Sequence, residues 1–161
     1  MQSTFEDLMR AAEDHYLQTT EIHQFKQQVA TLQDRLTAYE TLRDQEAVIF
    51  QGILDLLEQD NIPNPGTEVR KLLTYWIAIL RYASMAMLIE QPETLENQLH
   101  WLAPILDRSE FKSLNQKIFE GLRPCLGSAL TESQMDQIEP YLQQIPHVLT
   151  CSSTQEFAVL S

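Results

Sequence analysis

Residues 70–88 read RKLLTYWIAILRYASMAML, and this stretch decides the fold. Between Tyr75 and Ile89 the only charged residue is Arg81. Apolar side chains therefore lie around nearly the whole circumference of a helix, which is typical of a helix enclosed by other helices. We expect this segment, from Thr67 or Glu68 to about Glu90, to be the core helix of the protein.

Arg81 interrupts this apolar run near its middle. If the helix is enclosed, the guanidinium is buried, and a buried guanidinium without a partner is strongly destabilising. The sequence therefore predicts an acceptor for Arg81. An acceptor within the chain and a carboxylate of a neighbouring chain are both open at this point.

Two amphipathic segments precede the core helix. Residues 4–14 predict a short helix, which is marginal alone and must dock on its own body or on another chain. The next segment has the clearest periodicity of the chain, with apolar residues at steps of three and four: Ile22, Phe25, Val29, Leu32, Leu36 and Tyr39. A coiled coil is the alternative, but the run covers fewer than three heptads, which favours a long helix packed on a globular core.

Further helices are predicted on both sides of the core helix. One continues the long helix through Ala47–Leu57 and ends in the NIPNPG loop at 61–66. Three follow Pro92, and a capping box, Thr131 to Gln134, opens the last of them. The apolar and aromatic residues that indicate them are Leu95, Leu99, Trp101, Leu102 and Ile105, then Phe111, Leu114, Ile118, Phe119 and Leu122, then Met135, Ile138, Tyr141, Leu142 and Ile145.

Composition supports one all-α domain. The chain has 161 residues, only four glycines and a net charge of −12. Clustered Lys and Arg are absent, so nucleic acid is not expected as a partner. The start of the chain is unlike a signal peptide, and the core helix is expected to be too short and interrupted for a bilayer, which indicates a cytoplasmic protein without membrane insertion.

Three motifs, in order along the chain, resemble the phycobiliprotein family. In that family the central helix reads approximately Cys-Leu-Arg-Asp, a spacer, then Leu-Arg-Tyr, and LRY stands here at 80–82. AAEDHYLQTTEI at 11–22 is similar to the junction between the family's N-terminal extension and its body, and Arg35-Leu36, Ala38 and Leu42 are similar to a third family pattern. The resemblance covers about residues 10–90 and implies a globin-like fold of six to eight helices.

The resemblance also implies what the protein lacks. In the family the cysteine of the central helix holds a linear tetrapyrrole, a bilin, but here Leu72 occupies that position and Tyr75 that of the aspartate. A thioether cannot form through leucine, so no cofactor is expected. Some members carry a second pigment on a C-terminal cysteine; Cys125 and Cys151 are expected to be ordinary free thiols.

Interface residues follow from the same resemblance. The family's extension docks on a neighbouring subunit, with an acidic residue against an arginine of the central helix. Glu13 or Asp14 would supply the acid here and Arg81 the base. The predicted interface residues are Phe5, Leu8, Glu13, Asp14, Tyr16, Arg81 and Tyr82.

The sequence carries no clear signature of catalysis or of metal binding. It has no nucleophile elbow and no phosphate-binding glycine loop, so an enzyme is not expected. His15 and His23 flank Glu21, but their spacing is unlike a metal site and favours solvated surface. His100 stands about where a globin places its haem ligand, although an ordinary helix residue is the preferred interpretation.

The sequence thus predicts a bilin-free relative of phycobiliproteins that acts by protein contacts, as a homodimer or other homo-oligomer or with phycobiliprotein-type subunits. Its place would be the cyanobacterial cytoplasm, with association to the cytoplasmic face of thylakoids as an option. Two alternatives remain: a globin-type sensor of haem or a non-covalent tetrapyrrole, and a non-haem globin stress-signalling module. The expected organisation is one domain over 1–149, with residues 1–18 as the extension and 150–161 as a loosely held tail.

Overall fold

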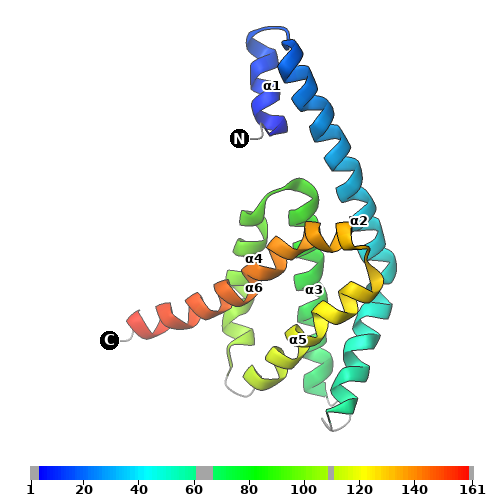
Figure 1. Ribbon diagram of the computed structural model, residues 1–161. Helices are drawn as coiled ribbons and strands as arrows, with labels where there is room; N and C mark the ends of the chain where they lie inside the picture. The colour runs from blue at the N-terminus through cyan, green and yellow to red at the C-terminus, as the bar shows by residue number, and fades with distance from the viewer. Residues whose placement is uncertain (1–3, 61–66, 109–110, 160–161) are drawn as a thin grey trace.

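A computed structural model describes the backbone of residues 4–60, 67–108 and 111–159, and the side chains of the same residues except 67 and 150–159. Within these ranges every regular element is a helix, which confirms the predicted all-α, globin-like class. The six helices are α1 (Phe5–Asp14), α2 (Thr19–Gln59), α3 (Thr67–Ile89), α4 (Pro92–Leu106), α5 (Lys112–Ala129) and α6 (Glu132–Val159). Figure 1 shows a body formed by α3 to α6 with the second part of α2.

The core lies around α3, as its sequence predicts. Its inward side buries Leu72, Trp76, Ile79, Leu80, Ala83, Ala86 and Met87. By length and composition the segment Glu68–Ile89 would also suffice to cross a membrane, so the expectation that it is too short was wrong. Half of this segment is buried inside the protein, and the core helix of a globular protein passes the same test. The finding therefore carries no evidence for a membrane span.

Helices α2, α4 and α6 pack directly on α3, and further contacts join the covering helices to one another. The most extensive contacts join α2 to α5 and α4 to α6, while α3 packs on α4, α2 and α6. Gly52 lets α2 approach α5 closely, because a Cβ there would lie 2.9 Å from Sγ of Cys125. Cys125 is a half-buried free thiol, and burial raises its pKa.

The long helix differs from its prediction in two respects. The two expected segments form one continuous helix of 41 residues. The apolar stripe of its first part does not pack on the globular core: Ile22, Phe25, Val29 and Leu36 are 37–43% exposed. This part of α2 projects beyond the body, and α1 folds back beside it to form a helical hairpin (Figure 1).

Pro124, Pro140 and Pro146 lie inside helices, although the sequence predicted that α5 would end near Pro124 and α6 at Pro146. α5 continues through Pro124 to Ala129, and α6 continues through Pro140 and Pro146 to Val159. Each proline removes one helical hydrogen bond, and burial of side chains on both sides, such as Leu122 and Leu126, outweighs that loss. The capping box at the start of α6 is confirmed: Thr131 Oγ1 accepts from the Gln134 amide, and Gln134 Oε1 accepts from the Thr131 amide. The domain limits 1–149, 1–18 and 150–161 stay a prediction, and the loop 61–66 lies outside the described residues.

Trp101 of α4 was expected to be a core or an interface aromatic, and it does not lie in the core. It is 81% exposed, whereas Leu99 and Ala103 on either side of it are buried. A residue two positions along a helix points about 200° away, so Trp101 cannot share the buried face with these neighbours. Val48 on α2 is also exposed, at 62%.

The buried arginine of the fold is Arg35, not Arg81. Its side chain is 8% exposed and reaches from α2 to the end of α3. Nε donates to the backbone oxygen of Leu88 at 3.0 Å, and Nη1 donates to Glu90 Oε1 at 3.0 Å and to Thr31 Oγ1 at 3.1 Å. Glu90 has a left-handed backbone, with φ 53°. The guanidinium thus satisfies a carbonyl that the end of α3 leaves without a helical donor.

Replacing this arginine tests its contribution. Arg35→Met should lower the free energy of unfolding by about 1–3 kcal/mol, because the Leu88 carbonyl loses its donor in a largely dry site. Urea denaturation measures the change. Arg43→Met on the same helix is the matched control, since Arg43 is exposed and pairs only with neighbouring Asp44, and its cost should stay below about 0.5 kcal/mol. Equal costs for the two variants would contradict the assignment.

Candidate functional site

The position that resembles a pigment anchor lies inside the core. Leu72 is 1% exposed, and Trp76, one turn further along α3, is 2% exposed. Apolar side chains therefore occupy this part of the protein themselves. No sulfur is present at position 72 to form a thioether.

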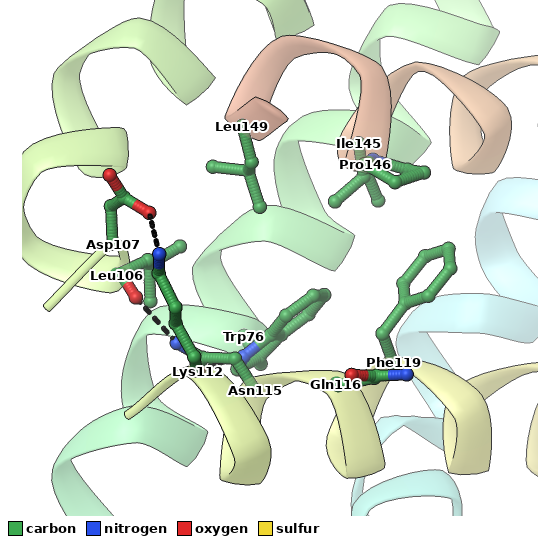
Figure 2. A pocket seen from close by; sticks show the side chains of 10 residues that line it. All are labelled: Trp76, Leu106, Asp107, Lys112, Asn115, Gln116, Phe119, Ile145, Pro146 and Leu149. Atoms are coloured by element: carbon green, nitrogen blue, oxygen red, sulfur yellow. Dashed lines mark hydrogen bonds and ion pairs between the residues drawn. The ribbon is translucent and has the colours of Figure 1, made fainter. Parts of the chain in front are cut away.

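A cavity of about 430 Å³ opens beside Trp76, between the C-terminal end of α4, the first turns of α5 and the middle of α6 (Figure 2). Asn115 orders its wall: Oδ1 accepts from Trp76 Nε1 at 3.0 Å, and Nδ2 donates to the Leu106 carbonyl at 2.7 Å. Lys112 lies 3.8 Å from Asp107. Figure 2 shows Ile145, Pro146 and Leu149 of α6 opposite Trp76 and Phe119. Most of this lining is apolar, and the pair Asp107–Lys112 is its only ion pair among the described residues.

His100 does not meet the requirement for a haem ligand. Its side chain is about half exposed and lies 3.7 Å from Glu96 on the same helix. It lines neither this cavity nor the groove between α2 and α3 described next. In the described part of the chain, no group of three His, Cys, Asp or Glu side chains is arranged to hold a metal ion.

A groove of about 440 Å³ lies between α2 and α3. We call it the α2/α3 groove; it is lined by Tyr39, Leu42, Arg43, Glu46, Leu80, Arg81, Tyr82, Ser84 and Met85. Two of the predicted interface residues, Arg81 and Tyr82, belong to it. Tyr82 and Met85 are 36% and 38% exposed, so the groove presents apolar as well as charged surface.

Arg81 was expected to be buried, and this was wrong. Its side chain is 68% exposed, because it stands nine positions, or about 180°, after buried Leu72. It pairs within the chain: Nε and Nη2 donate to the two oxygens of Glu46 at 2.7 and 2.9 Å. This hydrogen bonding raises the pKa of Arg81 above its already high usual value. Of the acceptors left open by the sequence, the structure provides the intrachain carboxylate.

The predicted interface residues of the N-terminus divide into two sets. Leu8 is 3% exposed. The ring of Phe5 packs edge-on against that of Phe25 of α2, with 5.7 Å between the ring centroids. Both side chains therefore face their own chain. Glu13, Asp14 and Tyr16 are exposed, and Tyr16 completely so. The second set remains available to another subunit, whereas Leu8 would be available only if α1 left α2.

His15 joins two acidic residues at the turn between α1 and α2. Nε2 lies 3.0 Å from Glu21 Oε1 and Nδ1 lies 3.3 Å from Asp14 Oδ2. The hydrogen bond to Glu21, followed by that to Asp14, raises the pKa of His15, while the bond from His15 lowers the pKa of Glu21. The sequence placed His15 near Glu21 but assigned it to solvated surface. His23 instead lies 3.5 Å from Gln27.

The comparisons with known proteins agree with this architecture. A search of curated proteins finds no match. A sequence model described as phycobilisome protein matches residues 10–108, which is more than half of the chain and includes the second part of the hairpin, α3 and the Arg81 position. The helical body, the projecting hairpin and this match lead to one conclusion: the chain belongs to the phycobilisome protein family.

Proposed function

We propose that this protein is a bilin-free, non-catalytic member of its family that acts by protein–protein contacts in or near the cyanobacterial light-harvesting antenna. Its role there would be structural, assembly-related or regulatory. The observation that carries the proposal is the exposed apolar stripe of α2, Ile22, Phe25, Val29 and Leu36, on a hairpin that projects from the body. Scattered apolar residues are normal on a protein surface, but a continuous stripe marks a contact surface.

The absence of a covalent pigment is argued from position 72. Bilin attachment in the family needs a thiolate that reaches solvent and the pigment, and Leu72 supplies neither sulfur nor access. The cavity beside Trp76 would accept a small molecule by volume alone. Asn115, its buried polar residue, already has Trp76 and the Leu106 carbonyl as hydrogen-bond partners, which gives no specific support for a tetrapyrrole.

The partner we propose is a second copy of this chain. The α2/α3 groove and the stripe both offer apolar surface, and Tyr82, Met85 and Ile89 extend it along α3. Acidic residues cluster on the hairpin at Glu6, Asp7, Glu13, Asp14 and Glu21, and the groove contains Arg43 and Arg81. Both arginines are already paired within the chain, Arg43 with Asp44 and Arg81 with Glu46. Asp14 or Glu13 of the other chain's hairpin would therefore join or replace Glu46 beside Arg81. Antenna subunits of the same fold are the alternative occupants.

The location we propose is the cyanobacterial cytoplasm, with association to the cytoplasmic face of thylakoids through antenna components. A net charge of −12 disfavours direct binding to nucleic acid or to an anionic lipid surface. The burial of half of α3 disfavours insertion into the bilayer.

An aspartate on the stripe tests pairing. Leu36→Asp should weaken self-association by about tenfold or more, because a carboxylate would lie in a desolvated apolar contact. Sedimentation equilibrium measures the dissociation constant. Val48→Asp is the control: Val48 is more exposed than Leu36 but lies about 120° away around α2.

A wild-type chain that stays monomeric would contradict the second copy as partner. Capture of antenna subunits by the wild-type chain but not by Leu36→Asp would then identify the alternative occupant. Equal association of Leu36→Asp and the wild type would refute a role for the stripe.

A cysteine at position 72 tests the pigment-free assignment. Wild type made in a bilin-producing host should lack a visible absorption band, and Leu72→Cys should lack it too, because its thiol would be buried. In a background with Cys125→Ser and Cys151→Ser, Ellman's reagent should react with this thiol at least about a hundredfold more slowly than with exposed Thr74→Cys. A covalently held pigment in the wild type would refute the proposal, and a haem band lost in His100→Ala would support the sensor alternative.

A further inference from the structure

The link between α1 and α2 is a short elbow whose hydrogen bonds converge on one carboxylate. His15 ends α1, and its backbone amide donates to the Ala11 carbonyl. Gln18 precedes α2, and its amide donates to Glu21 Oε1 at 3.1 Å. The same oxygen of Glu21 lies 3.0 Å from Nε2 of His15. Glu21 therefore ties the end of α1 to the start of α2.

Both ring nitrogens of His15 face carboxylates, Asp14 at Nδ1 and Glu21 at Nε2. A carboxylate only accepts hydrogen bonds, and a neutral imidazole has a single N–H to donate. The neutral ring thus leaves one nitrogen lone pair against a carboxylate oxygen. Only the imidazolium donates to both partners at once, so this arrangement is fully hydrogen-bonded only when His15 is protonated.

We propose that the His15 elbow is a pH-operated latch that holds α1 against α2 when the imidazole is protonated and loosens it when the proton leaves. The inference rests on the proposed function, because it concerns regulation of the same hairpin that we propose for pairing. It adds that subunit pairing responds to pH through one histidine. His15 has a carboxylate oxygen within 3.5 Å of each ring nitrogen, at 3.3 Å from Nδ1 and 3.0 Å from Nε2.

The rest of the α1 contact is small, so the latch matters. α1 has ten residues, and a helix of this length is marginal without docking. Leu8 is its buried residue, and the edge-on contact between Phe5 and Phe25 is its aromatic contact with α2. The imidazolium adds a favourable charge at the C-terminal end of α1, where the helix dipole is negative.

The pH window follows from the groups that face the ring, Asp14 from α1 and Glu21 from α2. The folded state raises the pKa of His15 above 6.5, so its contribution is complete below 6.5 and is lost as pH rises through the higher folded value. The folded state lowers the pKa of Glu21 below 4.5, so its contribution is complete above 4.5 and is lost as pH falls through the lower folded value. The latch is closed between these limits and opens on the alkaline side.

Two measurements on the full-length chain test the latch and its effect on pairing separately. Nuclear magnetic resonance follows the His15 imidazole and the Phe5–Phe25 ring contact as pH rises from below the ordinary histidine pKa to the alkaline side of the raised one. The ring contact should weaken along the same titration curve as His15. The pKa of His15 should fall in Glu21→Gln. Sedimentation over the same range should show the dissociation constant changing about two- to fivefold, the size expected of exposed charge pairs.

Two matched variants test whether the pH dependence of pairing comes from His15. His15→Gln should remove the pH dependence of pairing, whereas His23→Gln, two residues beyond Glu21 on α2, should keep it. A His15 pKa that does not change in Glu21→Gln, or a Phe5–Phe25 contact that does not change with pH, would overturn the latch. A chain that is monomeric at every pH would contradict the proposed pairing, and resonance would still decide the latch. Pairing that is independent of pH while the ring contact changes would overturn the regulation.

Discussion

The need to enclose α3 is the constraint on which the rest of the structure depends. A helix with Leu72, Trp76, Ile79 and Leu80 on one side must remove that side from water, and each such side chain contributes on the order of 2 kcal/mol when fully buried. α2, α4 and α6 supply most of the cover, and α5 adds Asn115 and Phe119 beside Trp76. The outer side of α3 is left with Arg81, Tyr82 and Met85, and these become surface residues of the α2/α3 groove.

Two polar contacts determine how the covering helices are placed. Arg35 joins α2 to the last turn of α3 through Leu88 and Glu90, and Asn115 joins α5 to Trp76 and to the end of α4. Both contacts satisfy backbone carbonyls near helix ends, which would be costly without a donor. Nonpolar packing alone is tolerant of small shifts between helices, whereas these bonds permit one arrangement.

The hairpin of α1 and the first part of α2 buries less of its apolar surface than the body does. α1 covers part of the α2 stripe with Leu8 and Phe5, and leaves Ile22, Phe25, Val29 and Leu36 partly exposed. A structure with so little internal cover is open both to a partner and to regulation at its hinge. The same hairpin thus carries both proposals, pairing through its stripe and pH response through His15, Asp14 and Glu21.

The sequence by itself determined the all-α class, the central helix, the α6 capping box and the loss of the pigment cysteine. Each of these features can be recognised within one or two helical turns, from the spacing of apolar residues, from turn residues or from a single motif position. The three motifs in the sequence also identified the family. The sequence misplaced Arg81 and left Trp101 open between core and interface, since an apolar run does not reveal which side of a helix its neighbours leave uncovered. Only the tertiary structure decided that Arg35 is the buried arginine, that Arg81 pairs with Glu46, and that α2 projects as a hairpin. Those outcomes depend on contacts between residues 35 to 55 positions apart, whose geometry no local pattern encodes.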